Sequence, residues 1–225
     1  MRGVARFGSI VLGVVLVFGG TAAFASTGLY DQTGKNTSTS NLDGTTVIIT
    51  PSSFNAASGQ CVLYSVLLPD FSSSRQLETG VVGCNNANID GTCSSGYAFS
   101  ESFNGSNYSC AQGNAFTTGS ANTALIERSS GTTTVWGATD GSYASQSGFG
   151  ATDSIPGIAW GEASSGSACP SSPHSVSFTS WKKFINASGW SYVTSAPTYH
   201  GHQDFPTSPC WTIGSLSSTG DFNAS

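Results

Sequence analysis

Charged side chains are scarce in this sequence, and basic ones are the scarcest. The 225 residues include 7 Lys and Arg against 12 Asp and Glu, and charged residues make up 8% of the chain. Only Lys182 and Lys183 are adjacent basic residues. Nucleic acids and anionic membranes both require clustered Lys and Arg for binding. The composition therefore argues against either one as a partner.

Three further features are missing. No stretch of about 12 or more residues keeps the helical period in good helix formers, so we expect less than about 10% helix. No Cys-x-x-Cys pair occurs, which argues against a zinc or redox motif. No serine lies in a Gly-x-Ser-x-Gly motif, so the sequence offers no recognisable nucleophile for a serine-hydrolase triad. We expect neither a cofactor nor a metal ion.

The N-terminus has the pattern of a secretory signal peptide. Arg2 and Arg6 form a short basic start, Ile10–Phe18 is apolar apart from one glycine, and Ala23–Ala25 gives the small-x-small cleavage pattern. The apolar run is shorter than the roughly 20 residues that a membrane helix needs. We therefore predict that residues 1–25 are removed and that a secreted, extracellular protein begins at Ser26. That protein has 5 basic and 12 acidic side chains, a net charge of −7, and no membrane contact after cleavage.

All six cysteines lie beyond the predicted cleavage site. An even number in an exported chain indicates disulfides, here three, for which fifteen pairings are possible. We favour the pairings that close short loops or fix the C-terminal tail, namely Cys61–Cys84, Cys93–Cys110 and Cys169–Cys210.

From residue 45 onward the sequence consists of short β-branched or alternating runs separated by Gly, Ser, Asn or Pro. Such runs, together with 11% aromatic residues, predict an all-β fold: an antiparallel β-sandwich of the jelly-roll, concanavalin-like type, stapled by disulfides. We expect residues 26–44 to form a polar arm or edge strand, and residues 45–225 one sandwich domain with a Cys-tethered C-terminal extension. The expected strands are Thr46–Thr50, Cys61–Leu68, Gln76–Val82, Tyr97–Phe103, Ala124–Arg128, Thr132–Trp136, Ile158–Trp160, Val176–Phe184 (which could end in a helical turn) and Trp190–Thr194.

Carboxylates occur within three of these runs. Strand alternation places Glu78 on one face with Gln76, and Glu101 on one face with Tyr97 and Phe99. A carboxylate between aromatic neighbours is desolvated, which raises its pKa unless a donor or cation compensates. A third carboxylate follows an aromatic residue in the same way, Glu162 after Trp160.

These positions carry a resemblance to the glutamic peptidases, the eqolisins. The segments Gln-Leu-Glu-Thr-Gly-Val at 76–81, Tyr-Ala-Phe-Ser-Glu at 97–101 and Ala-Trp-Gly-Glu at 159–162 are similar, in order and spacing, to three landmarks of that family. The resemblance implies a double-sheet jelly roll with a groove across one concave sheet. It also implies a catalytic pair of one Gln and one Glu, in which the glutamate activates water and the amide stabilises the tetrahedral intermediate.

The sequence departs from the family at both catalytic positions. The glutamine falls on Glu78, and the general base falls on Ala159 when the tryptophans are matched, while a groove glutamate falls on Glu101. Glu162 substitutes for the base only if its strand is shifted. We therefore favour a non-catalytic binding or surface module whose groove, lined by Gln76, Tyr97, Phe99 and Trp160, holds an extended peptide or glycan. The alternatives are an acid endopeptidase that uses Glu78, Glu101 and Glu162, or another carboxylate hydrolase.

Two weaker patterns remain open. His200, His202 and Asp204 fit a metal site if they share a strand face, and a polar loop otherwise. Four tryptophans either stack on sugar rings or, as is usual for this residue, pack in the core: Trp136, Trp181, Trp190 and Trp211.

Overall fold

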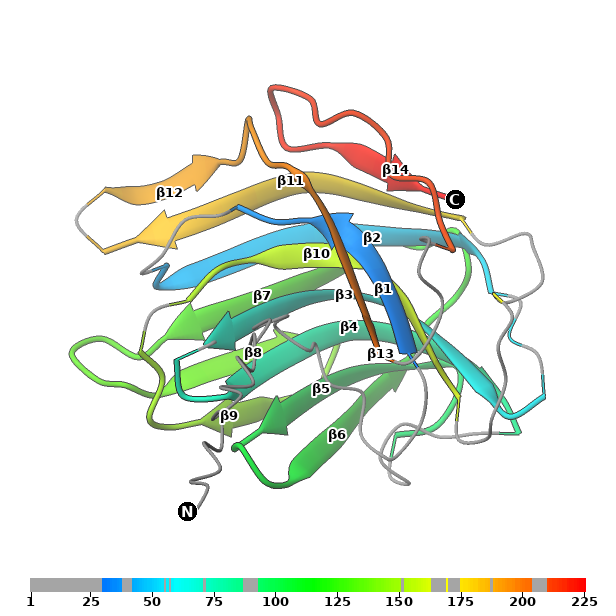
Figure 1. The fold of residues 1–225 in the computed structure, drawn as a ribbon, viewed down its shortest axis with the longest axis horizontal. Coiled ribbons are helices and arrows are strands. Elements are labelled where there is room, and N and C mark those ends of the chain that lie inside the picture. Colours follow the sequence, from blue (N-terminus) through cyan, green and yellow to red (C-terminus); the bar gives the residue numbers. More distant parts are fainter. Residues whose placement is uncertain are drawn as a thin grey trace, which may run out of the picture.

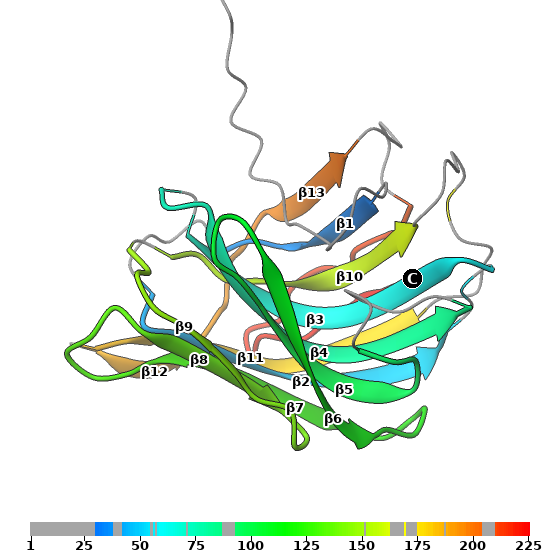
Figure 2. The same ribbon diagram turned by 90° about the horizontal axis from the view of Figure 1, so that it is seen from below.

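The computed structural model describes residues 30–37, 42–54, 56, 58–70, 72–86, 93–150, 152–162, 169, 175–186, 188–203 and 210–225. These residues form two antiparallel sheets that lie face to face as the two layers of a sandwich (Figures 1 and 2). They contain no α-helix, and consequently no helix that is long and apolar enough to cross a membrane. The predicted signal peptide lies outside the described residues.

The first layer, sheet A, has seven strands. Their order is β13 (Thr198–Gln203), β1 (Tyr30–Lys35), β10 (Ile155–Glu162), β3 (Gln60–Asp70), β4 (Arg75–Asn85), β5 (Tyr97–Phe103) and β6 (Tyr108–Ala115). Sheet B has the order β12 (Gly189–Tyr192), β11 (Ser175–Ile185), β2 (Gly44–Ser53), β7 (Asn122–Arg128), β8 (Val135–Thr139) and β9 (Ala144–Gln146), with β14 (Phe222–Ala224) pairing with β11.

Alternating side chains of the two sheets form the core. Val47 and Ile49 of β2 pack in one apolar cluster with Val62, Tyr64 and other inward side chains of β3. Each fully buried apolar side chain of this size contributes roughly 1.5–3 kcal/mol. Strand β2 alternates between buried and half-buried residues, so sheet B has one partly solvated face. All eleven residues of β3 are buried, so both faces of sheet A are shielded at its centre.

Eight of the nine expected strands lie within or largely within observed ones. Two expectations need correction. The run Thr132–Trp136 is a turn followed by the start of β8, because Thr132 caps the turn by donating to Ser129 O. Strand β11 continues to Ile185 with no helical turn; instead it bulges between Thr179 and Lys182.

The bulge of β11 buries a large side chain. Ser180 has a left-handed backbone with a φ of 55°, and the extra residue turns Trp181 inward, where it is fully buried. The Trp181 Nε1 donates to Thr45 Oγ1 and to Ser154 Oγ, both at 3.1 Å. A buried indole N–H therefore keeps its partners.

Residues 30–35 correct the expectation of a polar arm or edge strand. Strand β1 lies inside sheet A, with β10 on one side and β13 on the other. The edge position belongs to β13, which was not expected to be a strand, and the polar strand β6 forms the opposite edge. Polar residues are tolerated at such positions because backbone pairing, rather than side-chain hydrophobicity, holds these strands.

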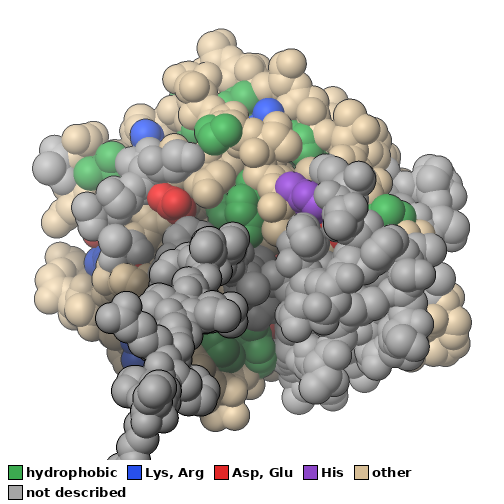
Figure 3. All heavy atoms as spheres, in the orientation of Figure 1, with side chains coloured by type: hydrophobic (Ala, Val, Ile, Leu, Met, Phe, Trp, Pro, Cys, Tyr) green, Lys and Arg blue, Asp and Glu red, His purple; other side chains and the backbone are tan. Residues whose placement is uncertain are grey.

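The structure contains the three disulfides that the cysteine spacing favoured: Cys61–Cys84, Cys93–Cys110 and Cys169–Cys210. The first joins β3 to β4, and the second joins the loop before β5 to β6. The third joins Cys169 to Cys210 in the C-terminal segment. Charged side chains are sparse on the face of the molecule in Figure 3, in keeping with the composition.

Candidate active site

Glu78 and Glu101 lie directly opposite each other on neighbouring strands. The register of β4 and β5 pairs the two residues, with Leu77 and Val81 of β4 and Ala98 of β5 directed into the core between the sheets. Alternation therefore turns both glutamates to the other side of the sheet, which we call the outer face of sheet A. Side chains that are paired in this way have Cβ atoms about 5 Å apart.

Both glutamates are almost completely shielded from solvent, each with 3% exposure. Two carboxylates this close and this buried cannot both be ionised without a large cost, so they favour sharing one proton. The hydroxyl of Ser65, on the adjacent strand β3, donates a hydrogen bond to Oε1 of Glu78. Ser65 thus orients Glu78 within the pair.

Tyr199 reaches toward Glu78 from β13, the edge strand of sheet A. Its ring packs against Leu67 of β3 and Ile155 of β10, although Tyr199 itself lies on β13. Burial raises the pKa of Tyr199 to about 12, and the negative charge of Glu78 acts in the same direction. Tyr199 is therefore neutral over the whole acid and neutral range, and it senses the charge of Glu78.

Two glycines let the ring of Tyr199 cross the sheet. Gly34 lies opposite both Tyr199 and Gly157, so neither of the strands between carries a side chain in this row. A Cβ on Gly34 would lie 2.3 Å from the Pro156 carbonyl oxygen and 2.8 Å from the Gly157 Cα. The close approach of these backbones excludes any other residue and leaves a transverse strip of bare backbone.

Gln32 is a residue of this face that sequence reasoning missed. It is fully buried, two residues from Gly34 on the same face of β1, and its register partners are Ala159 and Gly201. Neither Nε2 nor Oε1 has a hydrogen-bond partner among the described residues. A buried polar group without a partner costs about 1–3 kcal/mol, so such groups are rare unless they have a function. The polar segment around Gln32 gave no sequence signal for a site.

The other predicted site residues are divided between the two faces. Gln76 shares the outer face with Glu78 and is 6% exposed. Phe99 is also on this face but is fully buried in a cluster with Leu63 and Val82, and Tyr97 is half-buried. The register pairs Trp160 with Val62 and Glu162 with Gln60, which assigns both positions to the opposite face from Glu78. The structure thus brings Glu78 and Glu101 together, without Glu162.

His200 takes part in a structural contact. Its Nε2 lies 2.5 Å from Oδ1 of Asp31, which is fully buried. The other carboxylate oxygen of Asp31 accepts the backbone N–H of Cys210 at 2.9 Å, which ties the C-terminal segment to β1. Within the described part of the chain, no three His, Cys, Asp or Glu side chains are grouped as metal ligands. Asp204 and the side chain of His202 lie outside the described residues.

The comparisons with known proteins bear on the fold. No family model matches the sequence, and no curated protein matches it. Scytalidoglutamic peptidase, solved with a peptide-based transition-state analogue, is similar in structure, with a TM-score of 0.56 and 14% identity over 88% of this chain and 98% of that chain. The chain has the glutamic peptidase fold. A second solved structure is SCP-B, a member of the eqolisin family in complex with the tripeptide Ala-Ile-His, with 15% identity over 88% of this chain and 96% of that chain and a TM-score of 0.47.

Proposed function

We propose that this protein is a secreted, acid-acting endopeptidase in which Glu78 and Glu101 form the catalytic pair. The observation that carries the proposal is the direct cross-strand pairing of two glutamates that are each 3% exposed. Such a pair holds one proton between two carboxylates, which gives one base and one acid at the same place. The glutamic peptidase fold supports the choice of a polypeptide as substrate.

In this mechanism the ionised carboxylate removes a proton from a water molecule as the water attacks the scissile carbonyl carbon. The protonated carboxyl then transfers its proton to the leaving nitrogen. Ser65 donates to Glu78, which favours the ionised form of that residue and makes it the base, with Glu101 as the acid. The amide of Gln32 and the hydroxyl of Tyr199 lie on the same face and supply donors for carbonyl oxygens of the substrate.

This arrangement differs from the pair implied by the family resemblance. Ala159 stands where the general base is expected, and the register places it beside Gln32. The proposal therefore assigns the base to Glu78, where the family has its glutamine. The same departure favours the second candidate function, a binding module that holds an extended peptide or glycan without cleaving it.

Secretion is part of the proposal. The signal-peptide pattern of residues 1–25 and three disulfides are compatible with an oxidising compartment outside the cell. The pair also suits an acidic medium, since near neutral pH loss of the shared proton leaves no acid for the leaving group.

The test is cleavage of a denatured protein by the purified mature chain between about pH 2 and pH 7. We expect activity that is greatest well below neutral pH and that Glu78→Gln or Glu101→Gln reduces by about 100-fold or more. Asp140→Asn, an exposed carboxylate in the turn after β8, is the matched control and retains full activity.

Three results would overturn the proposal. One is the absence of cleavage at every pH, which leaves the binding module. Another is full activity in both glutamate variants. The third is loss of activity in Glu162→Gln alone, which would move the chemistry to the other face of β10.

A further inference from the structure

Aromatic side chains lie in a row across the outer face of sheet B, far in the fold from Glu78. The strand registers align five residues on successive strands: Trp190 of β12, Phe184 of β11, Gly44 of β2, Glu127 of β7 and Trp136 of β8. The residues next to them in sequence, such as Thr45, Ile126 and Val135, are buried on the inner side. The row therefore belongs to the solvent side of the sheet, and we call it the aromatic row.

The exposed large hydrophobic residues of the described chain all gather on this face. They are Trp190 at 41%, Tyr192 at 42% and Tyr143 at 58% exposure. Trp190 packs against Phe184 with ring centroids 5.2 Å apart, and Tyr143 stacks on Trp136 at 6.3 Å and 20°. Aromatic residues gathered on one face without a core to cover them mark an interaction site more often than chance exposure does.

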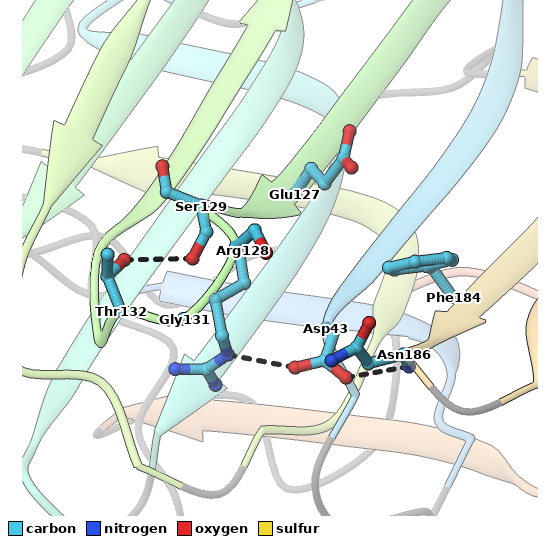
Figure 4. A pocket seen from close by; sticks show the side chains of 9 residues that line it. Asp43, Glu127, Arg128, Ser129, Gly131, Thr132, Phe184 and Asn186 are labelled. Carbon is cyan, nitrogen blue, oxygen red and sulfur yellow. Dashed lines mark hydrogen bonds and ion pairs between the residues drawn. The ribbon is translucent and has the colours of Figure 1, made fainter.

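A pocket of about 370 Å³ opens beside Phe184 and Glu127 of the row (Figure 4). Phe184 and Glu127 line it together with Asn186 and with hydroxyl and backbone groups of residues 129–132. Arg128 and Asp43 form an ion pair at 3.1 Å in its wall, and Asp43 also accepts the backbone N–H of Asn186 at 2.9 Å. The wall is therefore fixed in place, while Glu127 and the Asn186 amide offer hydrogen-bonding groups.

Gly44 makes room for the Trp190 ring at the centre of the row. A Cβ at this position would lie 2.8 Å from the Ile126 carbonyl oxygen and 3.3 Å from a Trp190 ring carbon. The Trp190 ring therefore reaches over Gly44, beside Phe184. From Trp190 to Trp136 the row crosses four inter-strand spacings of about 4.8 Å, or about 19 Å in all.

We propose that the aromatic row is a binding site for an extended glycan, a flat chain of neutral β-1,4-linked hexopyranose units that runs across the strands. Pyranose rings present C–H groups to aromatic faces and hydroxyls at their edges, which matches aromatic platforms on either side of a carboxylate and an amide. A peptide bound in extended form would instead require an unpaired strand edge, and this site is the face of a sheet. Lys182 lies over the Tyr192 ring at 4.8 Å, and Arg128 in the pocket wall is paired with Asp43, so an anionic polymer has little to bind.

The test is affinity electrophoresis of the mature protein in native gels that contain hydroxyethylcellulose or glycol chitin, followed by calorimetric titration with cellohexaose and chitohexaose. We expect retardation by at least one of these β-1,4-linked probes. Trp190→Ala and Trp136→Ala should each weaken binding about tenfold or more, which corresponds to about 1.4 kcal/mol, and Trp190→Phe should retain most of it. Thermal melts check that each variant is folded.

The control is Tyr108→Ala, which removes a half-buried aromatic residue from β6 at the edge of the other sheet and should bind as the wild type does. Absence of retardation by every probe would overturn the inference, as would equal loss in Tyr108→Ala. A dimer that dissociates in Trp190→Ala would also overturn it, because the row would then be covered by a second copy. None of these outcomes depends on whether Glu78 and Glu101 cleave a peptide.

Discussion

We expect the buried carboxylate of Asp70 to contribute stability that depends on pH, which its replacement by asparagine would reveal. Asp70 ends β3 and is 1% exposed. Its Oδ1 accepts the N–H of Ser72 at 3.0 Å and the Ser72 hydroxyl at 2.5 Å. Its Oδ2 accepts the Ser73 hydroxyl and the Gly150 N–H, both at 2.5 Å. The carboxylate thus holds the β3–β4 turn together and joins it to the segment after β9.

The direction of the pH effect follows from the pKa of Asp70. Burial raises this pKa, but the hydrogen bonds from Ser72, Ser73 and Gly150 lower it by more, so it lies below the ordinary value of 3.8. A carboxyl with a lowered pKa in the folded state contributes stability above its unfolded pKa. That contribution is lost as the pH falls through the folded pKa.

Asp70→Asn removes the charge and turns an amide N–H₂ toward at least one of these donors. Hydrogen bonds to charged groups contribute about 1.5–3 kcal/mol each, and the asparagine oxygen still accepts some of these bonds. We therefore expect the free energy of unfolding to fall by about 3 kcal/mol near pH 7. As the pH falls toward 2, the wild-type carboxyl approaches its folded pKa and begins to take up a proton, so the difference between Asp70→Asn and wild type should become smaller.

The measurement is guanidinium denaturation followed by tryptophan fluorescence at both pH values. Asp140→Asn serves as the exposed control, with a change within about 0.5 kcal/mol at either pH. A difference between Asp70→Asn and wild type that is the same at pH 2 and pH 7, or smaller than the control's at pH 7, would refute the reasoning.

Two further predictions concern stability. Glu101→Gln removes like-charge repulsion opposite Glu78, so we expect it to raise the free energy of unfolding near pH 7 by up to about 1 kcal/mol although it greatly reduces cleavage. A loss of stability in urea denaturation would contradict the shared-proton pair. Replacing Cys61 and Cys84 together by Ala removes the disulfide that closes a loop with a sequence separation of 23, and we expect the free energy of unfolding to fall by about 3 kcal/mol. The measurement is the midpoint of denaturation under oxidising conditions. A change below about 1 kcal/mol would mean that the β3–β4 hairpin does not depend on this disulfide.

The alternating runs were enough to predict the central strands. β3, β4 and β5 contain runs of β-branched, aromatic and other apolar residues and are bounded by turn residues, so local sequence decides their conformation. The same reasoning failed for β1, β6 and β13, because these strands are polar and are held by backbone pairing with residues far away in the chain. It also failed at Trp181, where an inward turn depends on a bulge opposite β2.

The sequence by itself determined that the chain carries a signal-peptide pattern, that it is all-β, which cysteines pair most simply, and that Glu78, Glu101 and Glu162 are the candidate site carboxylates. These features depend on neighbouring residues and on the two-residue period of a strand. Only the tertiary structure decided that Glu78 faces Glu101 and that Gln32 and Tyr199 lie on their face of sheet A, whereas the position of Glu162 lies on the other. It also decided that Trp136 and Trp190 share one open face while Trp181 and Trp211 are buried. The physical reason is that strand register and sheet order are set by hydrogen bonds between distant segments, and a shift of one residue moves every side chain to the other face.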